Sequence, residues 1–164
     1  MLLFLDVDGT LLPFGGPGPY PEYGPPLPGT SLAHPLLTRV DPALGPRLAG
    51  LGCVLVWATT WMEDANTCVS PWLGLPPLPL VDRPDDESHP PGLHWKTQPL
   101  MEWADGSPFV WVDDEIGEAD RAWVAEHCPT PALLHRVDHR TGLTDTDFLV
   151  LEPWISGRGG SGGR

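Results

Sequence analysis

The chain has 164 residues and a net charge of −13, from 22 acidic and 9 basic side chains. This length suits a single domain with a buried core, and the shortage of basic residues makes tight nucleic-acid binding unexpected. Because no stretch holds ~20 consecutive apolar residues and the three cysteines show no CxxC spacing, we expect a cytoplasmic protein with reduced thiols and no membrane partner.

The first half of the chain contains two predicted strands separated by a long loop and a helix. A short apolar run over residues 2–7 ends in a turn signal and is typical of a strand buried on both faces. Proline and glycine are dense from Pro13 to Ser31, which excludes helix and central strand and predicts a loop. A helix is expected over residues 42–51, followed by the buried strand CVLVWA over residues 53–58.

The second half continues the alternation of strands and helices. Further strands are predicted over residues 78–81, 109–112 and 132–137. Helices are predicted over residues 63–70, 96–104, 117–127 and 144–155, with a polar loop over residues 83–92. This alternation indicates an α/β fold with a mainly parallel sheet of five strands. Residues 1–155 would form one domain, and the Gly/Ser-rich residues 156–164 a flexible tail.

Three of the predicted strands end in polar residues. These residues are Asp6 and Asp8, Thr59 and Thr60, and Asp113 and Asp114. In parallel α/β sheets, ligands bind outside the carboxyl ends of the strands, so we expect the three groups to meet at one pocket. Converging carboxylates repel one another unless a cation lies between them, and oxygen ligands favour a hard cation such as Mg²⁺.

The groups around these acids are suited to holding a phosphate. Thr59 and Thr60 offer hydroxyl and backbone N–H groups at the start of a predicted helix, where phosphate oxygens bind readily, although plain helix capping would use the same residues. Lys96 offers a positive charge for the same phosphate. Gly9 allows a sharp exit from the first strand. Carboxylates, a cation and phosphate-binding groups together describe phosphoryl transfer through an aspartyl-phosphate.

Four motifs follow one another along the chain: DVDGT at residues 6–10, WATTW at 57–61, HWK at 94–96 and VWVDDE at 110–115. In this order they resemble the motifs of the haloacid dehalogenase (HAD) superfamily. More narrowly, the chain resembles the small HAD domains that also occur within multidomain RNA-repair proteins. The resemblance spans residues 1–155 and implies a Rossmann-like three-layer sandwich with its active site at the carboxyl ends of the strands.

The resemblance implies a role for each acidic residue of the motifs. Asp6 matches the nucleophile, and Asp8 matches the general acid/base, whose backbone carbonyl also contacts Mg²⁺. Asp113 and Asp114 match the acids of the last motif. One of these two would bind Mg²⁺ directly and the other would support it, and the sequence leaves open which does which.

The resemblance also implies roles in phosphate binding. Thr59 matches the phosphate-binding hydroxyl of the second motif, with Thr60 as an adjacent helper. Lys96 matches the lysine that steadies the phosphoaspartate. Gly9, directly after the two aspartates of the first motif, is expected to contact the substrate phosphate as well.

HAD enzymes often carry a cap domain, but neither gap between the motifs holds an independent core, so no large cap is expected. An open site suits a large substrate or needs a lid, and Pro13–Ser31 is the candidate lid. The expected activity is a Mg²⁺-dependent phosphatase that acts on a phosphorylated small molecule or nucleic-acid end. Two alternatives stay open: a phosphate-binding regulatory module without turnover, and a phosphatase dedicated to polynucleotide ends.

Overall fold

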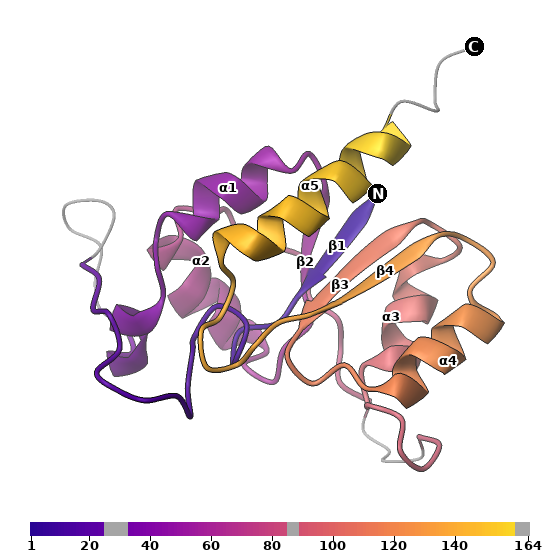
Figure 1. Ribbon diagram of the computed structural model, residues 1–164, viewed down its shortest axis with the longest axis horizontal. Coiled ribbons are helices and arrows are strands. Elements are labelled where there is room, and N and C mark those ends of the chain that lie inside the picture. Colours follow the sequence, from indigo (N-terminus) through magenta and orange to yellow (C-terminus); the bar gives the residue numbers. More distant parts are fainter. Residues whose placement is uncertain (25–32, 85–88, 160–164) are drawn as a thin grey trace.

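The computed structural model describes residues 1–24, 33–84 and 89–159. Its centre is a parallel sheet in the order β2-β1-β3-β4. The strands are β1 (Leu2–Leu5), β2 (Val54–Trp57), β3 (Phe109–Asp113) and β4 (Ala132–Arg136). Because every neighbouring pair is parallel, the carboxyl ends of all four strands lie along one edge of the sheet (Figure 1).

Helices cover both faces of the sheet, which confirms the three-layer α/β architecture (Figure 1). One face packs against α1 (Leu44–Gly50) and α5 (Asp145–Gly159), and the other against α3 (Thr97–Ala104) and α4 (Glu118–His127). Three short segments pack on the α1 side, namely the 3₁₀ helix η1 (Pro35–Arg39), the π-helical turn η2 (Ala65–Val69) and α2 (Ser70–Trp72).

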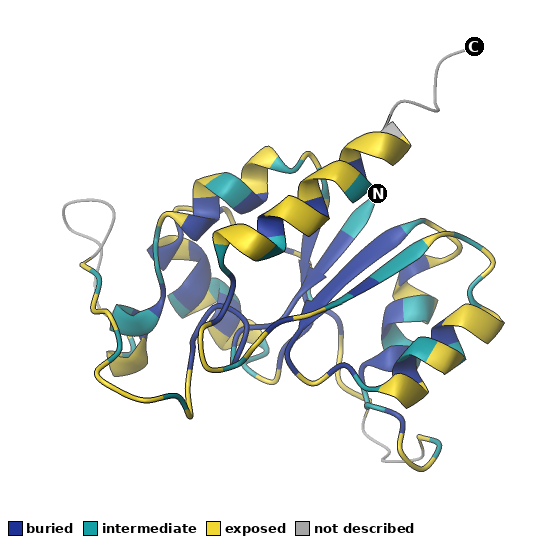
Figure 2. Ribbon diagram, viewed as in Figure 1, coloured by how far each residue is buried: buried dark blue, intermediate teal, exposed yellow. Residues whose placement is uncertain are grey.

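The apolar runs become strands because both faces of the sheet are covered. In β1, Leu3 and Leu5 belong to the core on the α1 and α5 side, whereas Phe4 belongs to the core on the α3 and α4 side. A strand buried on both faces needs apolar residues at every position, and β3 is buried throughout. Figure 2 shows the strands as buried and the outer faces of the helices as exposed.

The predicted fifth strand over residues 78–81 is wrong, since the sheet of the described chain has four strands. This segment only forms an isolated bridge between Leu80 and Trp57. The Trp57 N–H donates to the Pro79 carbonyl at 2.8 Å, and the Val81 N–H donates to the Trp57 carbonyl at 2.8 Å. Proline lacks the N–H group that a ladder needs, so the proline-rich sequence here cannot extend the pairing.

Residues 156–159 were expected in a flexible tail, but α5 continues to Gly159. The Arg158 guanidinium lies 4.4 Å from the centre of the Trp154 ring one turn earlier, a contact that favours the additional helical turn. Residues 160–164 lie outside the described chain, as do residues 25–31 of the candidate lid and residues 85–88 of the polar loop. None of the described helices is long and apolar enough to cross a membrane.

Gly45 marks a close contact between α1 and the residue that ends α2. A Cβ atom on Gly45 would lie 1.8 Å from the Leu73 carbonyl oxygen, so Gly45→Ala must push these elements apart. We expect this change to lower the free energy of unfolding by about 2 kcal/mol or more in urea titrations. Gly50→Ala is the matched control in the same helix. Nothing lies within 4 Å of its added Cβ, so it should be neutral or stabilise by ~0.5–1 kcal/mol, and equal losses would contradict the packing.

Candidate active site

A buried lysine joins the carboxyl ends of β1 and β3. The Lys96 Nζ atom lies 2.9 Å from Oδ1 of Asp6 and 2.6 Å from Oδ2 of Asp113, and the lysine side chain is only 2% exposed. Lys96 occupies the N-cap position of α3, which places its side chain under the edge of the sheet. The chain leaves β1 toward β2 on one side and returns to β3 on the other, and such a switch in strand order is where open α/β sheets bind ligands.

The two adjacent acids after β3 have different surroundings. Asp113 is fully buried, and its Oδ2 accepts hydrogen bonds from Lys96 and from the Trp111 indole N–H at 3.1 Å. Its Oδ1 accepts the Glu115 backbone N–H at 2.9 Å. The Asp114 carboxylate lines the pocket and accepts no hydrogen bond from any other described residue. Asp113 is therefore already hydrogen-bonded by the protein, whereas Asp114 is the acid of the pair that lines the pocket.

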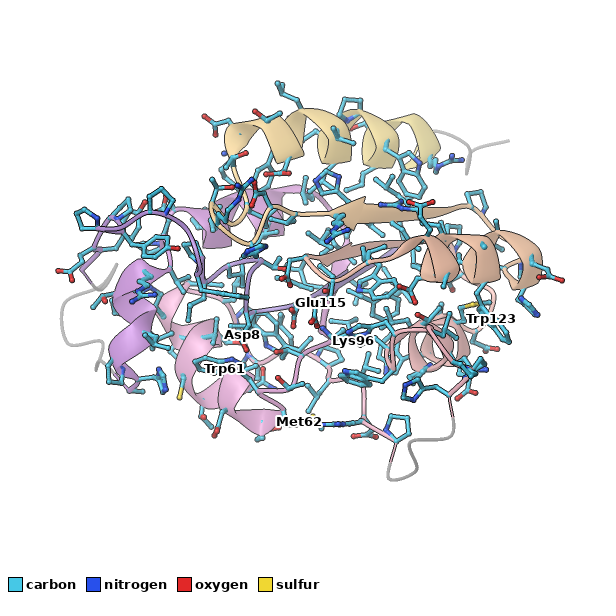
Figure 3. The ribbon with its side chains drawn as sticks, turned by 60° about the horizontal axis from the view of Figure 1, so that its bottom comes forward. Asp8, Trp61, Met62, Lys96, Glu115 and Trp123 are labelled. Atoms are coloured by element: carbon cyan, nitrogen blue, oxygen red, sulfur yellow. The ribbon has the colours of Figure 1, made fainter. Side chains whose placement is uncertain are left out.

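A pocket of about 210 Å³ opens at this edge of the sheet. It is lined by Asp6, Asp8, Phe14, Thr60, Lys96, Asp114 and Glu115. Figure 3 shows Asp8, Lys96 and Glu115 gathered in this region with Trp61 beside Asp8, whereas Trp123 lies apart from them. The structure thus brings residues from the first, third and fourth motifs, and Thr60 from the second, to one pocket.

Three carboxylates at this pocket form a group that fits a divalent cation. One oxygen each from Asp6, Asp113 and Asp114 lies within 4.8 Å of the others. Such a set of oxygen ligands alone suits Mg²⁺ better than a softer metal. Gly9 makes room for this group, because a Cβ there would lie 2.4 Å from Oδ2 of Asp114, and its φ of +69° suits glycine.

Asp8 lies beside this carboxylate group and has a different partner. Its Oδ2 accepts a hydrogen bond from the Trp61 indole N–H at 3.0 Å. The Trp61 ring in turn packs edge-on against His34, with 4.9 Å between the ring centres. Asp8 is therefore held in place by Trp61, with its other carboxylate oxygen left for a ligand. The contact of the Asp8 carbonyl with Mg²⁺ stays a prediction.

The two threonines after β2 take different positions. Thr60 is exposed and lines the pocket. Thr59 is fully buried, and its hydroxyl oxygen accepts the backbone N–H of Trp61 at 3.3 Å. Thr60 is thus the threonine of this pair that lines the pocket, and direct phosphate binding by Thr59 stays a prediction.

Burial and mutual repulsion shift the titration of the acids. Burial, with a smaller contribution from the Asp113 charge, raises the pKa of Asp6 to about 7 against the opposing effect of Lys96. Burial and the neighbouring charges of Asp113 and Glu115 raise the pKa of Asp114 to about 6. Burial disfavours the charged lysine, but Asp6 and Asp113 raise the pKa of Lys96 above its usual value. Lys96 is therefore protonated at neutral pH. Asp6 and Asp114 hold protons near neutral pH that a bound cation would displace.

A comparison with protein families decides how this arrangement is classified. The family model for the HAD domain in Swiss Army Knife RNA repair proteins matches residues 2–148. The chain belongs to this family. No curated protein and no solved structure matched the chain in the other two comparisons. The matched residues include every residue of the pocket and all four motifs, and the four-stranded α/β sandwich agrees with a HAD domain that lacks a cap.

The pocket of this HAD domain contains two residues that the sequence did not identify as site residues. Phe14 belongs to the Pro/Gly-rich segment, and Glu115 directly follows the Asp113 and Asp114 pair. The Glu115 carboxylate lies 3.1 Å from Nε2 of His94, two positions before Lys96. In the sequence, Glu115 was marked only by its closeness to the last motif, and Phe14 by its place at the start of the candidate lid.

The raised pKa of Asp6 predicts how metal-free stability depends on pH. Between the usual carboxyl value near 4 and about 7, the folded protein keeps a proton that the unfolded chain has lost, so stability falls as pH rises through this window. In EDTA, Asp6→Asn should therefore gain stability relative to the wild type by about 2 kcal/mol from pH 5 to pH 8. Urea unfolding at several pH values measures this difference. Asp105→Asn changes an acid at an exposed helix end, so its free energy of unfolding should change with pH as that of the wild type does. If the pKa of Asp6 were normal, Asp6→Asn would also follow the wild type.

Proposed function

We propose that this HAD domain is a Mg²⁺-dependent phosphatase that acts through an aspartyl-phosphate on Asp6. The observation that carries the proposal is the contact of one buried lysine with Asp6 and Asp113 at a pocket that also holds Asp8 and Asp114. If Lys96 were an ordinary surface lysine, or if the acids only formed a turn after a strand, there would be no reason to bury a cation between two carboxylates. Membership of the HAD family supports the same reaction class.

Within the carboxylate group, we assign Asp6 and Asp114 as side-chain ligands of Mg²⁺. Both oxygens of Asp113 already accept hydrogen bonds from Lys96, Trp111 and the Glu115 backbone, so Asp113 serves to position Lys96. When bound, Mg²⁺ would neutralise charge on the phosphate and on the attacking carboxylate. The sequence left open which of the two paired acids binds the metal directly, and we propose that it is Asp114.

The first chemical step uses the free oxygen of Asp6. Because Lys96 binds Oδ1 of Asp6, Oδ2 remains to attack phosphorus as the bond between phosphorus and the leaving oxygen breaks. Trp61 occupies Oδ2 of Asp8, which leaves the other oxygen to give its proton to the leaving group. Lys96 stabilises the negative charge of the phosphoaspartate, and Thr60, which lines the pocket, offers a hydroxyl group for a phosphate oxygen.

The second step regenerates the enzyme. Asp8, now a carboxylate, takes a proton from a water molecule that attacks phosphorus, and the bond between phosphorus and Asp6 breaks. Inorganic phosphate leaves, Asp6 is again a carboxylate and Asp8 is again protonated. One residue thus acts as acid and then as base, which its place at the pocket wall allows.

Two further questions concern turnover and cellular location. A phosphate-binding module without turnover is less well supported, because Asp8, the residue whose loss would end turnover, is present and held by Trp61. The three cysteines, all within the described chain, are free thiols, which supports our proposal of a cytoplasmic enzyme. The family description names RNA repair proteins, so a polynucleotide end remains the second candidate substrate.

The test of the proposed reaction is hydrolysis of p-nitrophenyl phosphate. We expect turnover with Mg²⁺, none in EDTA, and a loss in kcat of about 10³-fold or more for Asp6→Asn because its amide is not a nucleophile. Asp105→Asn makes the same chemical change at an exposed helix end and should keep wild-type activity. An active wild type with an equally active Asp6→Asn variant would contradict the nucleophile, and an inactive wild type would favour the module.

The Trp61 contact predicts a second, more selective effect. Trp61→Phe keeps an aromatic ring but removes the N–H that donates to Asp8, so Asp8 loses its orientation. We expect kcat to fall about 10-fold for an alkyl phosphate, whose leaving oxygen needs the Asp8 proton, and by less for p-nitrophenyl phosphate. Trp103→Phe, at an exposed position on α3, is the matched control. An unchanged rate on the alkyl phosphate would show that Trp61 does not act through Asp8.

A further inference from the structure

The pocket contains one acidic residue that the proposed reaction does not use. In that reaction Asp6 is the nucleophile, Asp8 the acid and base, and Asp114 a ligand of the metal. Glu115 lines the same pocket, and its side chain is 64% exposed (Figure 3). An exposed carboxylate gains no stability from lying beside three other acids, because like charges repel. Its position therefore needs a reason other than stability.

His94 holds the Glu115 side chain in place. Its Nε2 atom lies 3.1 Å from Oε2 of Glu115, and the histidine side chain is only 13% exposed. Its Nδ1 atom accepts the backbone N–H of Lys96 at 3.1 Å, so the proton of the neutral ring lies on Nε2 and is donated to Glu115. A doubly protonated ring would direct a second N–H at the Lys96 N–H. The neutral ring therefore fits these contacts and leaves the negative charge of Glu115 without a compensating cation.

The histidine is itself anchored by a buried carboxylate. The His94 backbone N–H donates to Oδ1 of Asp120 at 2.8 Å, and Asp120 is only 2% exposed. The same carboxylate accepts the Thr97 hydroxyl at 2.6 Å and the Gly117 backbone N–H at 2.8 Å, which joins the starts of α3 and α4. Glu115 is thus oriented by a rigid part of the fold, as a residue that selects a substrate has to be.

The pocket is small, and one of its lining residues is aromatic. Its volume of about 210 Å³ lies below the range of roughly 300–1,000 Å³ that holds a drug-sized ligand. A phosphate with a short alcohol would fill it, whereas a nucleoside would extend beyond it. Phe14 lines the same pocket and is 42% exposed. An open aromatic face together with a carboxylate is a combination that binds an alkylammonium group.

The positive charge of the pocket lies at the reacting phosphate and not at Glu115. Among the described residues that line the pocket, Lys96 is the one lysine or arginine, and it contacts Asp6. Arg136 donates its Nε–H to the Asp114 carbonyl, but it lines a separate depression. A leaving alcohol beside Glu115 therefore meets a negative charge, which attracts an ammonium group and repels a carboxylate or a second phosphate.

We propose that Glu115, positioned by His94, selects phosphate monoesters of short alcohols that carry an ammonium group. Because His94 contacts Oε2 of Glu115, Oε1 remains to accept a hydrogen bond from the ammonium group, whose carbon atoms would pack on the Phe14 ring. This proposal rests on the phosphatase reaction proposed above and specifies its substrate class. A polynucleotide end is less suitable, since Glu115 would repel its next phosphate.

The test is a series of substrates of similar size that differ in the charge of the leaving alcohol. Phosphoethanolamine carries an ammonium group, hydroxyethyl phosphate a neutral hydroxyl and phosphoglycolate a carboxylate. We expect kcat/KM of the wild type with Mg²⁺ to fall along this series by at least about 10-fold, mainly through KM, because the charge acts on binding. The preference should shrink as salt rises.

Substitution of Glu115 decides whether this residue causes the preference, since the alcohols also differ as leaving groups. Glu115→Gln keeps the size of the side chain and removes the charge, so the ratio of phosphoethanolamine to phosphoglycolate activity should fall about 10-fold. Glu118→Gln, exposed at the start of α4, is the matched control and should keep the wild-type ratio. Phe14→Leu removes the aromatic face and should lower the ratio about 3-fold.

Two variants of His94 separate its two contacts. In His94→Asn the amide oxygen replaces Nδ1 as the acceptor for Lys96, but the side chain does not reach Glu115, so the ratio should fall as in Glu115→Gln. In His94→Gln the amide N–H reaches Glu115 and the acceptor for Lys96 is lost. This variant should keep the ratio within about 2-fold and lower kcat for every substrate. Equal losses on all substrates in both variants would show a purely structural role.

The outcomes separate selection from the reaction. Turnover with equal kcat/KM along the series, or a ratio that Glu115→Gln leaves unchanged, would overturn the selection and leave the phosphatase standing. Failure of the phosphatase would appear as no turnover of any substrate, p-nitrophenyl phosphate included. In that case phosphoethanolamine and phosphoglycolate are titrated with Mg²⁺ into Asp6→Asn and followed by tryptophan fluorescence. Tighter binding of phosphoethanolamine that is lost on adding Glu115→Gln would support the selection, and equal or no binding would overturn it.

Discussion

The ion pairs of Lys96 with Asp6 and Asp113 are the interaction on which the rest of the site depends. Two carboxylates at the ends of neighbouring strands would repel each other strongly in a buried setting, and one enclosed ammonium group removes most of that repulsion. The lysine also ties the start of α3 to the edge of the sheet. Both oxygens of Asp113 accept hydrogen bonds, one of them from Lys96. The adjacent Asp114 is therefore the acid of the pair that lines the pocket and could bind a cation.

Most of the residues that line the pocket are acidic. Burial, together with the smaller effect of neighbouring carboxylates, raises the pKa values of Asp6 and Asp114, so these two acids hold protons near neutral pH that a divalent cation would displace. Among the residues that line the pocket, Phe14 adds an exposed aromatic ring and Lys96 a positive charge, although the chain as a whole is acidic.

Most elements of the fold could be predicted because their signals are local. Runs of consecutive apolar residues such as those of β1 and β3 fit only a strand covered on both faces, and the helices between them required a parallel sheet. The prediction failed over residues 78–81, where apolar side chains suggested a strand but Pro79 among them lacks the N–H group that a ladder requires. It also ended α5 too early, since Arg158 packs on Trp154 despite the glycines around it.

The sequence by itself determined that acids follow the first and fourth predicted strands, and parallel strands place such residues at one edge whatever the rest of the fold does. Only the tertiary structure decided which atoms meet there. Three side-chain contacts join segments that are far apart along the chain, namely Lys96 with Asp113, Trp61 with Asp8 and His139 with Phe14. These pairings depend on how α3 and the loops pack against the sheet, and no periodic pattern in the sequence records that packing.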